Sequence, residues 1–365
     1  MKILFLSGEP SGDLYLNYLI ENFNKLYPQI KLYVIGNKEN LKGNFQLLLD
    51  TKNFAVVGFY EGIKKSFSLL PYLKEIVEKI KEIKPDIFIP ISFPGFNLPL
   101  IKRIKNKKLK IVYFAPPQIW VWGKFRYKIL KKYVDKIICL FPFEKEFYEK
   151  LKIKAFYLGN PLLEIVKTNL TKEEIKEKYN IKDEKILILM PGSRKEIIKK
   201  NLSFFLKVYE ELNKDFKIKP FILGLKNLRS YKEDNLLNIP IVYEDHYELI
   251  SISDLVLTSL GTSTLEIALL NRPFISIYFP SFLTLLVGKF LVKTQYFSLP
   301  NILLKEKVFL EFINPKLEII YQKAKEILEN KINYQSYFEE IKKILNNKKE
   351  IAKNIINEIL TNSQI

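Results

Sequence analysis

Short apolar runs alternate with longer amphipathic stretches along most of the chain. The apolar runs are rich in β-branched residues and have the length of strands, and lysine and glutamate recur between them at helical spacing. The runs lie at residues 3–6, 32–35, 87–91, 110–114, 136–140, 186–190, 219–223, 240–243, 254–258 and 274–278. Regular alternation of this kind is typical of parallel sheets covered by helices. The pattern therefore predicts an α/β protein.

The runs form two groups, separated by the segment LGNPLLEIV at residues 158–166. The sequence ILILMPGSR then repeats the organisation of the N-terminus, with an apolar strand, a tight turn and a helix. A chain of 365 residues is long enough for two domains. We therefore predict two doubly wound parallel-sheet (Rossmann-like) domains facing a cleft. We expect them at residues 1–158 and 159–315, with C-terminal helices at 316–365 that pack back on the chain.

The first strand is followed by a loop with two acids. In MKILFLSGEPSGDLYLNYLI the apolar run ends at Leu6, and we expect a helix after Asp13. Ligands of open α/β sheets bind at the carboxyl ends of strands, opposite helix N-termini. Carboxylates repel phosphate, so Glu9 and Asp13 favour sugar hydroxyls, a proton acceptor or a helix cap. From the loop alone, Asp13 as the N-cap is the favoured interpretation.

The formal net charge of +19 indicates attraction to polyanions: nucleic acid, an anionic membrane surface or phosphorylated substrates. The lysines are spread over the whole chain, which argues against a dedicated nucleic-acid-binding protein. His246 is the only histidine, so sites with several histidine ligands are excluded, and we expect a capping or surface role for it. The single cysteine excludes an intrachain disulfide.

We expect neither a secretory signal nor a transmembrane helix. The first apolar run is short and an acid follows at once. The longest charge-free stretch, residues 273–288, is too short to span a bilayer and contains Pro280. Its apolar helix would lie either in the core or a dimer contact, or in a membrane interface.

Two segments of the second half carry candidate ligand-binding residues. In MPGSR, Ser193 and Arg194 follow a strand at a helix start, where arginine and helix amides can clamp a diphosphate. The alternative is a surface arginine on a tight turn. A second strand ends before a loop that offers glycine, hydroxyls and a carboxylate to a nucleotide sugar: Gly261, Thr262, Ser263 and Glu266.

Aromatic and basic residues are interleaved at residues 115–137. The segment contains Trp120, Trp122, Lys124 and Arg126. Single-stranded nucleic acid could stack there, and a membrane interface or acyl chains would suit the same side chains.

Taken together, the motifs resemble those of the lipid-A-disaccharide synthase family, which are inverting glycosyltransferases of the GT-B fold. The resemblance runs nearly end to end in order and spacing. The matching segments are GEPSGD at 8–13, WVW at 120–122, FPFEKEFY at 141–148, GNPL at 159–162, PGSR at 191–194, GTSTLE at 261–266 and VKTQYFSLPNIL at 292–303.

The resemblance implies transfer of 2,3-diacylglucosamine from its UDP derivative to 2,3-diacylglucosamine 1-phosphate, giving lipid A disaccharide 1-phosphate and UDP. It implies no metal and no other cofactor. It also implies a peripheral enzyme at the cytoplasmic face of the inner membrane, and a homodimer that exchanges C-terminal segments. Carried over by motif, donor contacts come from Ser193, Arg194, Gly261, Thr262, Ser263, Glu266 and Asn301. Glu9 and Asp13 are the catalytic candidates.

One segment departs from the family pattern. The family has a motif of the form I-D-x-P-D-F-N, and Ser92 and Gly95 stand here in place of its two aspartates, whereas Asn97 is kept. We assign Asn97, with the aromatic and basic segment, to the acceptor and membrane side. The second aspartate is the leading candidate for the family's general base. Three readings follow: Glu9 or Asp13 takes the proton, the acceptor differs, or the chain binds UDP-sugar and lipid with impaired catalysis.

Overall fold

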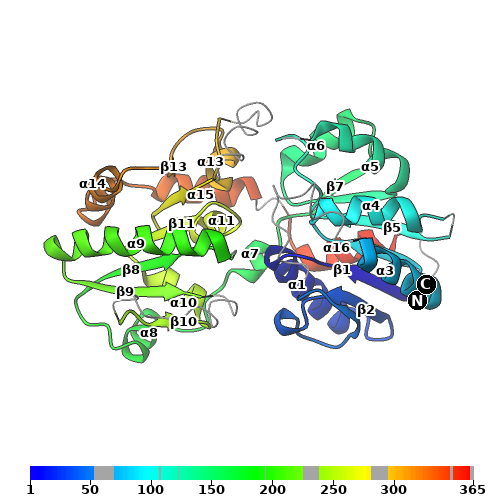
Figure 1. Cartoon of the computed structure of the whole chain (residues 1–365), viewed down its shortest axis with the longest axis horizontal. Helices are drawn as coiled ribbons and strands as arrows, with labels where there is room; N and C mark the ends of the chain where they lie inside the picture. The colour runs from blue at the N-terminus through cyan, green and yellow to red at the C-terminus, as the bar shows by residue number, and fades with distance from the viewer. Residues whose placement is uncertain are drawn as a thin grey trace. The chain divides into compact units, whose positions relative to one another are not determined.

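The computed structural model describes residues 1–52, 70–106, 108–121, 123–193, 195–224, 238–280, 295–345 and 348–361 (Figure 1). They form two compact units. The first comprises the described residues of Met1–Pro161 and Leu345–Ile365, and the second those of Leu162–Leu286 and Thr294–Ile344. The second half of the predicted C-terminal helical segment thus belongs with the N-terminal unit.

The first unit is built on a parallel sheet with the order β3-β2-β1-β4-β5-β6-β7. The change of direction between β1 and β4 is the arrangement of a doubly wound fold, in which ligands bind beyond the carboxyl ends of the strands. The strands are β1 (Lys2–Leu6), β2 (Lys31–Gly36), β3 (Gln46–Asp50), β4 (Ile87–Pro90), β5 (Lys110–Phe114), β6 (Lys136–Cys139) and β7 (Ala155–Tyr157).

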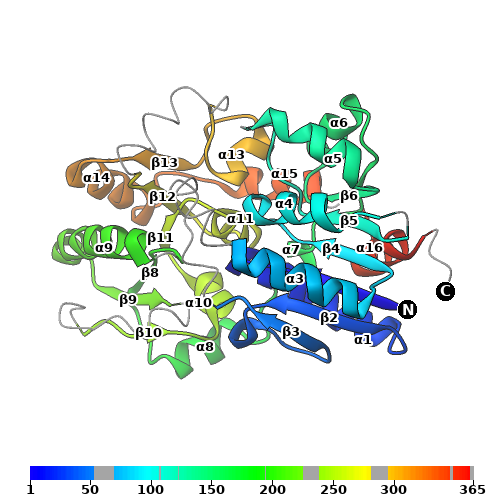
Figure 2. The ribbon, with the colours of Figure 1, turned by 45° about the vertical axis from the view of Figure 1, so that its right-hand side comes forward.

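Helices cover both faces of this sheet (Figures 1 and 2). One face packs against α3, α4, α5 and α6 through the side chains of Leu4, Phe88 and Ile111. The alternate residue Phe5 points to the other face and meets Phe23 of α1, with ring centroids 5.8 Å apart. The helices are α1 (Pro10–Leu26), α3 (Leu70–Ile83), α4 (Pro94–Ile104), α5 (Tyr127–Tyr133), α6 (Pro142–Lys150) and α16 (Ile351–Leu360), with 3₁₀ turns η1 (Lys38–Asn40) and η4 (Lys124–Arg126).

The second unit repeats this plan with the strand order β10-β9-β8-β11-β12-β13. Its strands are β8 (Lys185–Met190), β9 (Ile218–Leu223), β10 (Ile241–Val242), β11 (Leu255–Ser259), β12 (Phe274–Tyr278) and β13 (Leu310–Ile313). Its helices are α7 (Leu162–Ile165), α8 (Lys172–Lys178), α9 (Lys195–Asp215), α10 (His246–Ile252), α11 (Ser263–Leu269), α13 (Leu299–Leu304), α14 (Leu317–Leu328) and α15 (Gln335–Leu345).

The predicted fold class is confirmed, because every expected apolar run contains a strand and every strand pair is parallel. Strands β3, β7 and β13 were not predicted. The start of the first helix was also misplaced: α1 begins at Pro10, with Glu9 as its N-cap residue. In the part of the chain that the structure describes, no helix combines the length and apolar character needed to cross a bilayer.

Candidate active site

Glu9 lies at the carboxyl end of β1, next to the turn that follows β4. The neighbouring strands are in register, with Leu6 beside Pro90, so the segments that follow them meet at one edge of the sheet. A Cβ atom on Gly8 would lie 2.3 Å from the Phe93 ring, so glycine is needed for this close approach. The backbone N–H of Phe93 donates to Oε1 of Glu9 over 3.4 Å. The Glu9 carboxylate is thereby directed toward the turn after β4.

That turn has an unusual backbone. Ser92 and Phe93 both have φ of 47°, in the left-handed region that residues with a side chain rarely adopt. The carbonyl of Ser92 accepts bonds from Asn97 Nδ2 at 2.8 Å and from the Tyr113 hydroxyl at 2.6 Å. Asn97 is completely buried. We therefore assign Asn97 to the support of this turn rather than to direct contact with an acceptor.

Gly95 occupies the second position of α4 and is exposed. A Cβ atom built on it meets nothing within 4 Å. The absence of a carboxylate here is therefore not forced by packing. An acidic side chain would extend into open space at the N-terminus of α4, where the helix dipole favours negative charge.

Asp13 is not the N-cap of α1, so that interpretation is wrong. It lies in the first turn of the helix and is only 3% exposed. Asn40 Nδ2 donates to its Oδ2 over 2.8 Å, and this bond ties α1 to η1. Burial raises the pKa of Asp13 to about 6, and the bond from Asn40 opposes this effect. Asp13 is better placed to hold the loop after β2 than to reach a substrate.

Trp120 is anchored by a buried carboxylate. Glu144, in the first turn of α6, accepts from Trp120 Nε1 at 3.2 Å and from the backbone N–H groups of Leu140 and Phe141. The Trp120 ring meets Phe143 edge-on, with centroids 4.9 Å apart. Burial raises the pKa of Glu144 to about 7, against the effect of these hydrogen bonds. Glu144 was not singled out from the sequence.

The basic residues next to Trp120 are only partly described. Trp122 and the side chain of Lys124 lie outside the described residues. Arg126 is half-buried, and burial lowers the pKa of its guanidinium. Its Cζ atom lies 5.8 Å from the ring centroid of Phe125, which is 69% exposed. An exposed phenylalanine beside a cation suits a boundary between water and an apolar phase.

In the second unit, the turn after β8 carries Ser193. Gly192 has φ of 108°, which favours glycine, and Asn201 Nδ2 donates to the Pro191 carbonyl over 2.8 Å to hold the turn. Ser193 is half-buried and lies two residues before the start of α9. Arg194 lies outside the described residues. The turn ends beside β11, because a Cβ atom on Gly192 would lie 3.0 Å from Ser259 Oγ.

The loop after β11 leaves an open surface at Gly261. A Cβ atom there would meet nothing within 4 Å, so a ligand could approach the backbone. Thr262 is partly exposed at the start of α11. The Ser263 hydroxyl instead lies 3.0 Å from Thr258 Oγ1 and donates to the Ser259 carbonyl. Thr262 is thus more accessible to a ligand through its side chain than Ser263 is.

Glu266 follows one turn into α11. Its Oε2 accepts from the hydroxyl of Tyr247, on α10, over 3.0 Å. Burial raises the pKa of Glu266, and the bond from Tyr247 opposes this effect. The hydroxyl fixes the carboxylate in one orientation, as paired-hydroxyl recognition would require. Tyr247 was not predicted from the sequence, because no family segment contains it. Only its neighbour His246 was considered as a candidate in this part of the chain.

Asn301 is completely buried in α13. Its Nδ2 donates to the Phe309 carbonyl, and its Oδ1 accepts from the N–H groups of Val308 and Phe309. We assign Asn301 to the support of the segment before β13. His246, at the start of α10, is half-buried rather than on the surface, and its Nε2 lies 3.1 Å from the Val242 carbonyl.

The topology and these polar turns define the class of protein. Two doubly wound parallel-sheet units are the architecture of the GT-B fold. Solved structures agree over nearly the whole chain. UDP-GlcNAc 2-epimerase from Neisseria meningitidis, bound to UDP-GlcNAc, has a TM-score of 0.65 at 13% identity and covers 99% of this chain and 100% of its own. The spinosyn forosaminyltransferase SpnP has a TM-score of 0.59 at 8% identity over 98% of each chain.

Sequence comparison identifies the family within this class. The family model described as lipid-A-disaccharide synthetase matches residues 3–360. The lipid-A-disaccharide synthase of Francisella tularensis subsp. tularensis (strain WY96-3418) is 31% identical over 357 residues, which cover 94% of each chain. The chain belongs to the lipid-A-disaccharide synthase family and is a glycosyltransferase. The family match does not favour the alternative acceptor or the impaired relative.

Proposed function

We propose that the chain transfers 2,3-diacylglucosamine from UDP-2,3-diacylglucosamine to 2,3-diacylglucosamine 1-phosphate. The products are lipid A disaccharide 1-phosphate and UDP. The observation that carries this proposal is the family match along residues 3–360. The open backbone at Gly261 and the oriented carboxylate of Glu266 support a nucleotide-sugar site in the second unit.

The reaction is a single displacement at the anomeric carbon. A hydroxyl of the acceptor attacks that carbon while the bond to the UDP oxygen breaks, so the configuration inverts. A base must take the proton of the hydroxyl as the new bond forms. The UDP diphosphate leaves as an anion, which needs positive charge or backbone N–H groups beside it.

Glu9 is our candidate for the base. The Phe93 amide directs its carboxylate to the turn that contains Ser92 and precedes Gly95 of α4, the two positions at which the family has its aspartates. Glu9 is partly exposed, whereas Asp13 is buried and bonded to Asn40. The partly exposed carboxylate of Glu9 is therefore more accessible to an acceptor hydroxyl than that of Asp13. Glu9 therefore stands in for the missing acid without any change of fold.

Donor binding is assigned to the turns after β8 and β11. The N–H groups and hydroxyls of Ser193 and Thr262, together with Arg194, suit the diphosphate. The lack of a side chain at Gly261 lets the donor come close to the backbone, and the Glu266 carboxylate suits the paired hydroxyls of ribose. Ser263 supports the turn after β11 from inside, and Asn301 supports the segment before β13.

The substrates are anionic lipids, so the enzyme must meet a membrane surface. Trp120, Trp122, Lys124 and Arg126, with exposed Phe125, suit the boundary between lipid headgroups and acyl chains. The net charge of +19 would strengthen attraction to anionic lipid. We accordingly propose peripheral association with the cytoplasmic face of the inner membrane. A homodimer remains a prediction from the family resemblance.

The test is product formation by the purified full chain. The protein is incubated with both substrates, and mass spectrometry follows the disaccharide 1-phosphate. We expect the disaccharide phosphate and an equal amount of UDP. UDP binding without disaccharide, under conditions in which a family member turns over, would contradict the proposal.

A further inference from the structure

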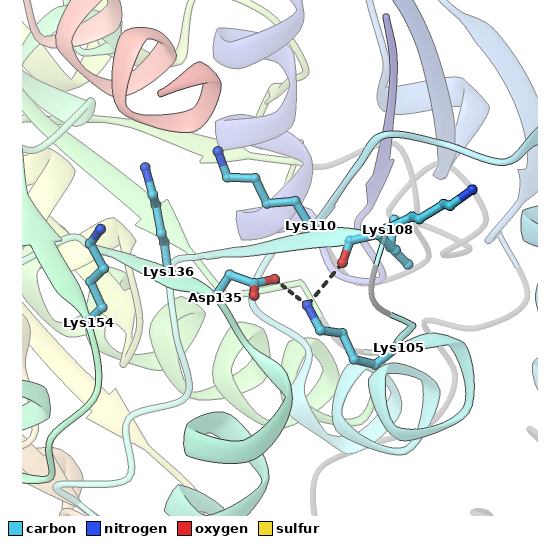
Figure 3. A pocket seen from close by; sticks show the side chains of 7 residues that line it. Lys105, Lys108, Lys110, Asp135, Lys136 and Lys154 are labelled. Atoms are coloured by element: carbon cyan, nitrogen blue, oxygen red, sulfur yellow. Dashed lines mark hydrogen bonds and ion pairs between the residues drawn. The ribbon is translucent and has the colours of Figure 1, made fainter. Parts of the chain in front are cut away.

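A pocket lined with lysines (Figure 3) lies at the amino ends of β5, β6 and β7, whereas Glu9 follows the carboxyl end of β1. It has a volume of about 350 Å³ and is lined by Lys105, Lys108, Leu109, Lys110, Asp135, Lys136 and Lys154. Lys110 and Lys136 are the first residues of β5 and β6, and Lys154 directly precedes β7. In a parallel sheet the amino ends of the strands lie together, which brings these three cations to one edge.

The three side chains share a direction. Figure 3 shows the ammonium groups of Lys110, Lys136 and Lys154 pointing to the same side, while Lys105 turns to Asp135 and Lys108 points away. Lys136 and Lys154 both approach the ring of Phe156, at 5.6 and 5.5 Å from its centroid. This common orientation makes a compact cluster of positive charge.

The lysines that line the pocket outnumber the carboxylates beside them, which are Asp135 and Glu358 among the described residues. Lys105 pairs with Asp135 at 2.5 Å, and Lys136 pairs with Glu358 at 2.5 Å. Among the described residues, no carboxylate forms an ion pair with Lys154. Burial, and then repulsion from Lys136, lower the pKa of Lys110 to about 8. The local field is therefore positive, which favours an added anion.

The same lysines hold the last turn of α16. Lys110 Nζ donates to the carbonyls of Ile359 and Thr361, at 2.8 and 2.5 Å. Lys136 Nζ donates to the Glu358 carbonyl at 2.9 Å. Cations at a helix C-terminus stabilise it through the orphan carbonyls and the dipole. Lys136 Nζ also donates to the Thr361 carbonyl over 3.3 Å, and Lys136 is only 3% exposed, so its ammonium group is used by α16. Repulsion from Lys136 acts on Lys110 and opposes this anchorage, and an anion held at the exposed Lys154 would offset that repulsion.

We propose that the lysine pocket binds a phosphate or diphosphate group, apart from the donor and acceptor surfaces, and that its occupant strengthens the anchorage of α16. Ammonium groups act as point charges that suit phosphate oxygens from several directions. The cavity has room for more than inorganic phosphate alone, so the group could belong to a free phosphorylated metabolite or to a lipid headgroup. The shared chemistry is the phosphate group.

The first experiment titrates inorganic diphosphate into the full chain by calorimetry, at constant ionic strength set with chloride. The pocket variant is Lys154→Gln, and the control is Lys74→Gln, an exposed lysine on α3 that does not line the pocket. We expect about tenfold weaker binding at one site in the pocket variant, because an ammonium contact is lost. The control should stay within about twofold of the unmodified chain. Equal affinity of the two variants for diphosphate would overturn the proposal. Binding of diphosphate at the donor surface should be the same in both variants and so does not affect the comparison.

A second readout tests the link to α16. Hydrogen exchange of the amides of Ile351–Leu360 should slow when diphosphate is added to the unmodified chain and to Lys74→Gln, and it should slow much less in Lys154→Gln. No change at these amides, with binding intact, would overturn the proposed coupling. Sedimentation with phosphatidylcholine vesicles, with and without phosphatidic acid, separates the sources. Selective loss of vesicle binding in Lys154→Gln points to a headgroup, and unchanged vesicle binding with weaker diphosphate binding points to a free phosphate.

Discussion

At the scale of single residues, the turn after β4 explains how the chain could work without the family's aspartates. Ser92 and Phe93 in left-handed conformations cost on the order of 1–3 kcal/mol each, and bonds from Asn97 and Tyr113 hold them there. This strained turn directs the Phe93 amide at Glu9. The same turn presents Gly95 with open space around it.

We predict that Gly95→Asp rescues a chain that lacks the Glu9 carboxylate. In a Glu9→Gln background it should raise turnover by about tenfold or more, because general-base catalysis is typically worth a hundredfold to ten-thousandfold. The open space at Gly95 and the favourable helix N-terminus should leave thermal stability unchanged or slightly higher. Turnover and melting temperature are measured together. Gly95→Asn is the matched control, and an equal rescue by it would show that charge is not the cause.

Asp13 gives a prediction about stability. Its pKa of about 6 lies above the unfolded value near 3.8, so the folded state holds the proton more tightly. That contribution is complete below pH 3.8 and is lost as the pH rises through 6. Asp13→Asn should therefore stabilise the chain at pH 7 by up to about 3 kcal/mol, from a shift of about two units, and by little at pH 4. Urea unfolding at both pH values measures the difference, and a stabilisation that is the same at both would contradict the assignment.

At the scale of elements, the start of α6 and the loop with Trp120 are linked by the hydrogen bond from Trp120 to Glu144. The Glu144 carboxyl is buried where its ionisation acts on the indole N–H. These two segments lie at the carboxyl end of β6, beside the segment assigned to the acceptor. Because the pKa of Glu144 is about 7, the charge of its carboxyl group beside the Trp120 indole should change across neutral pH.

We predict that Trp120 fluorescence titrates near pH 7 in a Trp122→Phe background. Glu144 has a raised pKa, so its proton stabilises the fold fully below pH 4.5, and this contribution is lost as the pH rises through about 7. Glu144→Gln should abolish the fluorescence titration. Glu146→Gln, an exposed position on the same helix, should retain it. Titrations of equal size in both variants would rule out Glu144 as the titrating group.

The elements also show what sequence patterns can and cannot predict. Strands such as β1 and β5 are buried on both faces and produce uninterrupted apolar runs. Strands β3, β7 and β13 lie at sheet edges and have three to five residues, and β3 and β13 are partly exposed, whereas β7 is missed because it has only three residues. Their sequences therefore lack the pattern. The start of α1 was misplaced because Pro10 and the glycine after it were read as a loop, although proline suits the first turn of a helix.

Within the candidate site, motif matching found residues but not their roles. Asn97 and Asn301 stand in the family motifs, yet both are fully buried and bind backbone groups. Glu144 stands in the family segment at 141–148, but its partner Trp120 lies 24 residues away, and Tyr247 stands in no family segment. Such pairings depend on tertiary packing, which a periodicity does not encode.

At the scale of the whole molecule, the excess of positive charge bears on where the enzyme meets its substrates. A net charge of +19 attracts anionic lipid over a distance set by the ionic strength. The charge is spread over the chain, so it should favour encounter with a surface more than it favours a particular ligand.

We predict that salt separates membrane encounter from donor binding. Turnover of substrates held in anionic vesicles should fall several-fold between about 50 and 500 mM salt, because the Debye length shrinks severalfold. UDP affinity, which depends on close contacts, should change much less. Parallel assays with substrates in neutral detergent micelles provide the control. An equal loss of turnover in micelles would place the salt effect in the active site.

In the proposed reaction, Glu9 takes the proton of the acceptor hydroxyl. The most direct test measures the single-turnover rate of disaccharide 1-phosphate formation by the unmodified chain, by Glu9→Gln and by Glu21→Gln, an exposed glutamate on the same helix. We expect a loss of about a hundredfold to ten-thousandfold in Glu9→Gln, with UDP affinity unchanged and Glu21→Gln fully active. Turnover by Glu9→Gln at the rate of the unmodified chain would contradict this role of Glu9.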